Sequence, residues 1–179
     1  MQTTKAFPDK EKSLTTALDN LHTDRETLRK LPIDTETKLP VFKIIIGETE
    51  YTDRKEAAKA FEDAVLSIKQ ADTSVKIGEF QGFPLAVTMN SPAMGGGVTA
   101  TMQGKYPHIA KLIESFAHNL KRLEGTLYNV DRNIDEVNAS LSKLRVDFTE
   151  AQKIVAEPFS QEQELANKES RLKTLTEEL

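Results

Sequence analysis

Basic and aromatic side chains gather around one predicted helix start, and their types could bind an anionic ligand. The group consists of Lys43, Tyr51, Arg54, Lys55, Lys59 and Lys76. A helix N-terminus with basic side chains and an aromatic ring can contact the phosphate backbone of a nucleic acid. Carboxylates stand among these charges, so an ordinary solvated surface is the alternative interpretation: Glu48, Glu50, Asp53, Glu56 and Glu62.

Other residue types that could carry chemistry form no recognisable set. The three histidines, His22, His108 and His118, lack metal-ligand spacing. The glycine-rich stretch 94–99 lacks the Gly-Lys-Ser/Thr ending of a phosphate-binding loop, and the chain has no Cys. We therefore expect no catalytic residue, cofactor or metal. An enzyme site beside the 90–97 loop is the weaker alternative.

Composition limits the classes of partner. The chain has 179 residues, a net charge of -4 and 6% aromatic residues, which favours a small domain with a helical stalk. The negative charge argues against indiscriminate binding to nucleic acid or anionic membranes. No apolar stretch approaches the length of a membrane span, and residues 1–12 lack the apolar core of a secretory signal. We therefore expect a cytoplasmic chain, without a membrane partner, that could be part of a larger protein.

A compact module over residues 40–107 would position the basic group. Residues 41–46 form a run typical of a strand, and a short return strand would carry Glu50 and Tyr51. A helix then starts with Thr52 or Asp53 as its N-cap. Three further strands are predicted at 74–80, 83–89 and 98–104. The pattern predicts an α+β fold with a small, mostly antiparallel sheet and one packed helix.

The longest regular pattern is a seam of apolar residues with alternating steps of three and four. It consists of Ile113, Phe116, Leu120, Leu123, Leu127, Val130, Ile134, Val137, Leu141, Leu144, Phe148, Ala151 and Val155. This spacing predicts a coiled-coil helix over 108–157, in which the seam from 113 to 155 would be roughly 65 Å long. A shorter helix of the same type is expected over 11–31, and the N-terminal segment of helix and connector covers 1–39. The two would pair inside one chain, or each would meet its counterpart in a second molecule. The module would thus be inserted between long coiled-coil helices.

The pattern of residues 158–179 predicts a C-terminal helix, and Pro158 interrupts the apolar seam just before it. Ser160 followed by Gln163 is typical of a new helix start, and an apolar stripe resumes at Leu165, Leu172, Leu175 and Leu179. Either the chain folds back against the long helix, which the proline and the new cap favour, or one kinked helix continues.

Several short segments, in a fixed order, carry a family resemblance. They are 47–57 (Gly-Glu-Thr-Glu-Tyr-Thr-Asp-Arg-Lys-Glu-Ala), 76–83 (Lys-Ile-Gly-Glu-Phe-Gln-Gly-Phe), 122–124 (Arg-Leu-Glu) and 157–165 (Glu-Pro-Phe-Ser-Gln-Glu-Gln-Glu-Leu). From about residue 41 to 179 the chain resembles the C-terminal region of very large proteins from conjugative elements and phages. Those proteins join an adenine-specific DNA methylase-like part to an SNF2-type helicase part.

The resemblance implies DNA metabolism for a parent protein, but no site residue is carried over. Neither the helicase motor motifs nor the methylase catalytic motif occurs in this chain. Gly125 stands where the family pattern has Asn, which puts a special role of that turn in doubt. The leading hypothesis is a non-catalytic accessory domain that positions DNA or a partner. The alternative is a self-associating coiled-coil scaffold without a nucleic-acid role, in which Leu127, Ile134 and Leu141 form the core between molecules.

Overall fold

The computed structural model describes residues 3–178, and it describes side chains there except at 3–5 and 158–160. The chain divides into two compact units, which we describe separately. One comprises residues 16–136. The other combines the segment up to residue 15 with the segment from residue 137 onward. The helices α1 (Thr3–Arg29) and α4 (Val130–Glu177) each contribute residues to both units.

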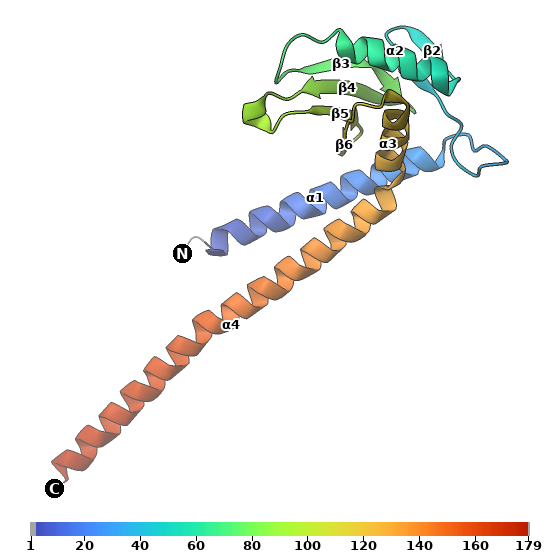
Figure 1. Cartoon of the computed structure of the whole chain (residues 1–179). Coiled ribbons are helices and arrows are strands. Elements are labelled where there is room, and N and C mark those ends of the chain that lie inside the picture. Colours follow the sequence, from blue (N-terminus) through green and yellow to red (C-terminus); the bar gives the residue numbers. More distant parts are fainter. Residues whose placement is uncertain (1–2, 179) are drawn as a thin grey trace. The chain divides into compact units, whose positions relative to one another are not determined.

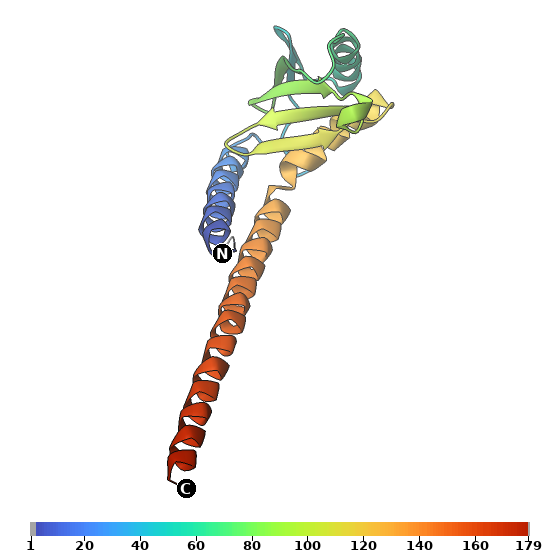
Figure 2. The ribbon, with the colours of Figure 1, turned by 90° about the vertical axis from the view of Figure 1, so that its left-hand side faces the viewer.

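Residues 16–136 contain a six-stranded sheet in which every neighbouring pair is antiparallel. The strands are β1 (Ile44–Ile46), β2 (Thr49–Tyr51), β3 (Ser74–Phe80), β4 (Phe83–Met89), β5 (Val98–Gln103) and β6 (Pro107–Lys111). Their order is β2-β1-β3-β4-β5-β6. The strands from β3 to β6 lie side by side, coloured green to yellow (Figures 1 and 2). The predicted α+β class and the β3–β4 hairpin are confirmed.

The two faces of this sheet differ in burial because side chains alternate along each strand. Leu85 lies opposite Met102, which in turn lies opposite His108, and all three are buried. The adjacent row belongs to the other face, where Lys76 lies opposite Ala86. The lysine is exposed and the alanine is half-buried. The apolar core of residues 16–136 therefore lies on one side of the sheet.

More helices contribute to that core than the one predicted, since Leu21 and Leu28 of α1 are buried, as are residues of α2 and α3. The helix α2 (Arg54–Leu66) begins at Asp53, whose Oδ1 accepts hydrogen bonds from the backbone N–H groups of Lys55 and Glu56, each at 3.0 Å. This confirms the predicted N-cap. The helix α3 (Phe116–Tyr128) contacts α2 and strands β5 and β6. The apolar residues Ala57, Phe61, Val65, Leu120, Leu123 and Leu127 are buried.

The predicted start of the long helix is wrong. Residues 107–111 form the edge strand β6, because His108, Ala110 and the following Leu112 are buried with a period of two. Ile113 lies after this strand and is 41% exposed, so it belongs to no helical seam. Its backbone N–H and C=O bond to the amide of Asn119 at 2.8 and 2.7 Å, which ties the connection to α3.

The predicted helix of 108–157 is also divided. One helix, α3, ends at Tyr128, Asn129 lies between, and α4 begins at Val130. The first part of the predicted seam, from Phe116 to Leu127, therefore lies on a short helix that packs in the core of residues 16–136. Only the part from Val130 onward belongs to the long helix.

The other unit contains the first residues of α1 and most of α4, which run antiparallel. The rings of Phe7 and Phe148 stack with their centroids 3.8 Å apart, and Arg145 donates from Nε to Glu11 Oε1 at 2.8 Å. Within residues 16–136, Arg25 and Asp131 approach to 3.4 Å with the same antiparallel sense. Each unit thus contains a contact between α1 and α4 of the same chain.

The predicted turn back at Pro158 does not occur, because α4 is one helix from Val130 to Glu177. A proline inside a helix costs about 3 kcal/mol through its missing N–H and its steric clash. Ending the helix would instead require a new and unfavourable nucleation step for residues that are good helix formers. The predicted cap at Ser160 concerns a side chain outside the described set. Leu179 also lies outside the described residues.

Candidate functional site

The six residues of the predicted nucleic-acid contact do not form one surface. Ala86 lies between the buried residues Leu85 and Val87, so it and its partner Lys76 belong to the sheet face away from the core. Lys43 pairs with Glu50 on β2 at 3.3 Å. The remaining candidates, Arg54, Lys55 and Lys59, are exposed on α2, and Tyr51 is half-buried on β2 just before that helix.

Arg54 is engaged within the fold. Its Nη1 and Nη2 atoms donate to the two carboxylate oxygens of Glu124 at 3.0 and 2.7 Å, and its guanidinium lies 4.6 Å from the centre of the Phe42 ring. The hydrogen bond with Glu124 raises the pKa of Arg54. This paired geometry is stronger than a single surface contact. Arg54 therefore links α2 to α3, and a phosphate would have to displace Glu124.

A second polar contact joins the β3–β4 turn to the segment before β1 and to the end of α3. The side-chain Nε2 of Gln81 donates to the Val41 carbonyl and to the Tyr128 hydroxyl, both at 2.8 Å. Burial raises the pKa of Tyr128 to about 12. A neutral phenol is thus favoured at this position far above neutral pH, so Tyr128 can donate a hydrogen bond but does not act as a general base near neutral pH.

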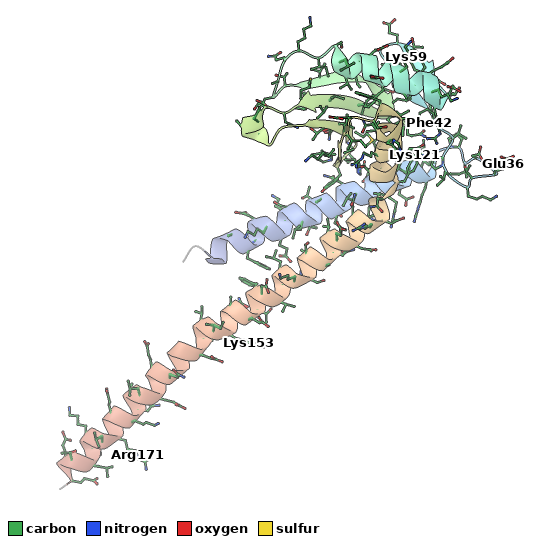
Figure 3. All side chains as sticks on the ribbon, in the orientation of Figure 1. Glu36, Phe42, Lys59, Lys121, Lys153 and Arg171 are labelled. Atoms are coloured by element: carbon green, nitrogen blue, oxygen red, sulfur yellow. The ribbon has the colours of Figure 1, made fainter. Side chains whose placement is uncertain are left out.

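Lys55 and Lys59 remain as the exposed basic residues of α2. Among the described residues neither has an ion-pair partner. They lie four positions apart, which brings both to one side of the helix, and Lys59 is labelled in Figure 3. The structure therefore reduces the predicted group to a pair of lysines near a helix N-terminus.

The most buried polar cluster is centred on Asp24 and was not predicted as a site. Asp24 is 2% exposed on α1. Its carboxylate accepts hydrogen bonds from the backbone N–H groups of Lys105 at 2.8 Å and Tyr106 at 2.9 Å, and it lies 2.9 Å from Nε2 of His108. A side chain at Gly104 would collide with this carboxylate. Asp24 thus holds the β5–β6 turn. The sequence feature that could have indicated this role is a charged residue at a position of the helical pattern where an apolar one is expected.

The aromatic surroundings of His108 close this cluster to ligands. His108 is 1% exposed, and the rings of Phe83 and Tyr106 meet its ring edge-on, with centroids 6.1 and 5.6 Å away. Its Nδ1 atom is buried and has no hydrogen-bond partner among the described residues. A carboxylate and an imidazole at this distance could pass a proton, but a substrate has no access to them. The contact between Asp24 and His108 therefore joins α1 to β6 within the fold.

An apolar pocket of about 350 Å³ lies where β4 ends and β5 begins, at the other end of β5 from the Asp24 cluster. It is lined by Val65, Leu66, Met89, Gly97, Val98, Leu112, Ile113, Glu114 and Phe116. Glu114 is the only titratable residue in this lining. Converging polar groups are typical of an enzyme site, and this pocket offers one carboxylate. In residues 3–178, moreover, no three His, Asp or Glu side chains lie close enough together to hold a metal ion.

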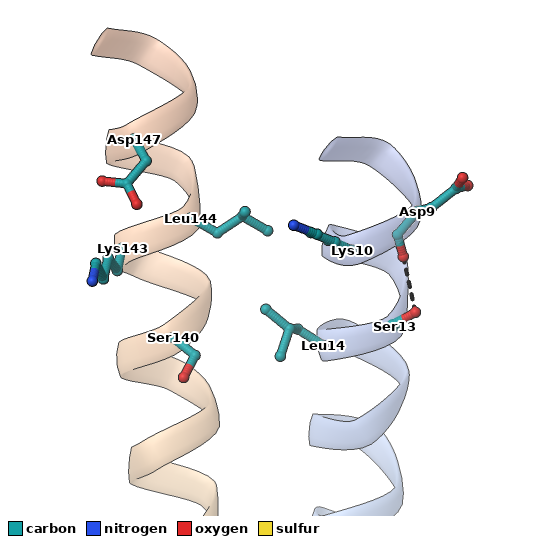
Figure 4. A pocket seen from close by; sticks show the side chains of 8 residues that line it. All are labelled: Asp9, Lys10, Ser13, Leu14, Ser140, Lys143, Leu144 and Asp147. Atoms are coloured by element: carbon teal, nitrogen blue, oxygen red, sulfur yellow. Dashed lines mark hydrogen bonds between the residues drawn. The ribbon is translucent and has the colours of Figure 1, made fainter. Parts of the chain in front are cut away.

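An open groove of about 510 Å³ lies between α1 and α4 in the second unit, and Figure 4 shows it. Leu14 and Leu144 point toward each other across it, Lys10 also extends toward Leu144, and Asp9 and Lys143 point away from the gap (Figure 4). Both leucines are half-buried. This groove belongs to the contact between the two helices.

Beyond this groove and Phe148, the described side chains of α4 are exposed to solvent. Every described side chain from Thr149 to Glu178 is exposed, including Lys153 and Arg171 in Figure 3. The apolar side chains share this exposure: Val155 is 75%, Leu165 58% and Leu172 67% exposed. We call residues 149–178 the arm. The predicted seam residue Val155 therefore has no partner helix among the described residues.

Comparison of the chain with protein-family models, with curated proteins and with solved structures finds no match. The described helices include none that combines the length and the apolar character needed to cross a membrane. The function of the chain has to be argued from its own surfaces.

Proposed function

We propose that this chain is a non-catalytic accessory domain that positions a partner or DNA through an α+β module carried on a coiled-coil stalk. Its parent would be a helicase and DNA methylase-like protein of a mobile element, as the sequence resemblance implies. The observation that carries the proposal is the arm, in which about 30 consecutive helical residues expose an apolar stripe. Large exposed apolar patches mark interaction sites.

The buried polar groups support the non-catalytic part of the proposal. Asp24 holds the β5–β6 turn, Arg54 joins α2 to α3, and Tyr128 completes a bond to Gln81. Each of these groups has a structural use. Catalytic acids and bases need access to a reacting atom, and the Asp24–His108 pair lacks that access.

The lysine pair of α2 supports a contact with DNA as one mode of positioning. Lys55 and Lys59 are exposed on one side of α2 near its start, where their ammonium groups can contact phosphates. Two phosphate contacts release about two counterions, so binding should weaken only moderately with salt. Such a contact suits a module that positions DNA within a larger machine.

The test combines the isolated chain with its parent. Binding of the chain to single-stranded and double-stranded DNA is measured across a salt series, with Lys55→Glu plus Lys59→Glu as the variant and Lys69→Glu as the matched control on an exposed loop. We expect salt-sensitive binding that is lost in the double variant. Deletion of residues 41–179 from the parent should impair its DNA binding or its helicase activity. Unchanged values of both would refute an accessory role.

The alternative of a self-associating scaffold needs a different surface from the one the sequence indicated. Leu127, Ile134 and Leu141 are buried within the single chain, at 0%, 5% and 8% exposure. They cannot form a core between molecules unless the fold opens. Self-association would therefore have to use the arm.

A further inference from the structure

The arm carries a stripe of apolar side chains with the spacing of a coiled-coil seam. Val155, Leu165 and Leu172 continue the alternating three-four spacing of Leu144 and Phe148, which lie beside α1. The arm is about 45 Å long at the rise of an α-helix. Most helical stability in proteins comes from packing of an apolar face, and within the described residues this face has no packing partner.

Two carboxylates interrupt the stripe at equivalent positions. Glu162 and Glu169 lie seven residues apart, three residues before Leu165 and Leu172 respectively, so they occupy seam positions of the same repeat. Both are exposed and have no ion-pair partner among the described residues. Over residues 149–178 the arm has seven carboxylates and four basic side chains. The arm as a whole is therefore acidic, and the two seam positions are carboxylates.

These carboxylates oppose pairing of the arm with a second copy of itself. In a parallel pair, Glu162 and Glu169 would each face their own counterpart, which places like charges together at seam positions. In an antiparallel pair, the same spacing would set Glu162 against Leu172 and would bury a carboxylate without a cation. Both orientations carry a penalty at two layers, so the sequence selects against a homodimer.

We propose that the arm docks an amphipathic helix of another protein or protein segment that carries Lys or Arg opposite Glu162 and Glu169. This proposal rests on the proposed accessory function and names the chemistry of its partner. The apolar residues of such a helix cover Leu165 and Leu172, and its basic residues neutralise the two seam carboxylates. Opposite charges at these positions fix the register and the choice of partner.

The experiment uses the full chain and two synthetic helical peptides. Each peptide spans four heptads, with Leu facing Leu165 and Leu172. One has Lys facing Glu162 and Glu169, and its twin has Glu at both places. Affinities are measured by fluorescence anisotropy while sedimentation records the mass of the chain alone. We expect about tenfold tighter binding of the Lys peptide, because two attractive charge pairs replace two repulsive ones.

Variants of the chain make the test specific. Glu162→Lys plus Glu169→Lys should reverse the preference between the peptides, and Leu165→Asp plus Leu172→Asp should abolish binding of both. Glu164→Lys changes the same charge on the solvent side of the same turn and should leave the preference unchanged.

Two results would overturn the proposal. One is a chain that dimerises on its own and becomes monomeric with the two Asp substitutions, since the occupant would then be a second copy. The other is equal or absent binding of the two peptides. Both results leave the accessory role open, because DNA binding and activity of the parent are measured separately.

Discussion

Removing the Asp24 carboxylate should destabilise residues 16–136 more than any exposed substitution on the same helix. The carboxylate accepts bonds from the backbone N–H groups of Lys105 and Tyr106 and lies 2.9 Å from Nε2 of His108. Asp24→Ala leaves these groups without an acceptor in a buried place. Losing one partner of a buried, hydrogen-bonded charge costs about 3–5 kcal/mol, which we expect as the loss in free energy of unfolding.

A more conservative substitution separates shape from hydrogen bonding. Asp24→Asn has nearly the same volume, but its amide has one oxygen, and its NH₂ group replaces one of the two oxygens that accept from the backbone. Because Oδ1 accepts from Lys105 and Oδ2 accepts from Tyr106, one backbone bond must be lost. We expect a cost of about 1–3 kcal/mol for the buried donor left without an acceptor. The exposed Asp19→Ala should lie within about 0.5 kcal/mol of the unchanged chain.

The assay is equilibrium unfolding in urea, followed by tyrosine fluorescence, because the chain has no Trp and all three Tyr lie within residues 16–136. Circular dichroism reports the helices in parallel. The expected order of destabilisation is Asp24→Ala, then Asp24→Asn, then Asp19→Ala. The reasoning fails if Asp24→Ala resembles Asp19→Ala, or if Asp24→Asn is as stable as the unchanged chain, since packing alone would then explain the cost of Asp24→Ala.

Two further predictions concern Gly104 and Tyr128. Gly104→Ala should lower the free energy of unfolding by about 1–3 kcal/mol, because its Cβ would meet the Asp24 carboxylate. The loss should be smaller when Gly104→Ala is combined with Asp24→Ala. Equal losses in both backgrounds would contradict this contact. Burial raises the pKa of Tyr128 to about 12, so the stability it contributes is complete below the unfolded value near 10 and declines as the pH rises from about 10 to 12. Ultraviolet titration of the folded chain should show one late-titrating tyrosine that Tyr128→Phe removes, and its persistence in that variant would assign the effect to another residue.

Local patterns predicted the strands where turns and periodicity agree. Residues 74–80 and 83–89 alternate on either side of Gln81-Gly82, and the structure has strands with these bounds. The strand β6 was missed because its short alternating pattern at His108 and Ala110 leads directly into the helical spacing that begins at Ile113. A strand of five residues is a weak signal beside a helical repeat of more than 40.

Apolar spacing also could not show where the long helix is divided. Leu127 and Val130 are three residues apart, which is the step expected inside a seam, yet Asn129 separates α3 from α4 between them. The residues before this point are buried in the core of residues 16–136, and those from Val130 onward belong to the long helix. A helical repeat specifies which side chains share a face, but the partner of that face depends on contacts far apart in the sequence.

The same limit applies to the basic group and to the arm. The sequence could not show that the basic residues are dispersed, nor that the apolar stripe of residues 149–178 is exposed. The partner of Arg54 is Glu124, 70 residues later, and no spacing rule connects them. The arm is an apolar stripe in the sequence like the rest of the seam, and its exposure follows from the antiparallel contact that brings Phe7 to Phe148. Beyond that contact, the carboxylates at Glu162 and Glu169 lie at seam positions with nothing to neutralise them within the described chain. Leu165 and Leu172 gain no burial within the described chain, so the proposed role of the apolar stripe and of these two carboxylates is to bind a basic partner helix.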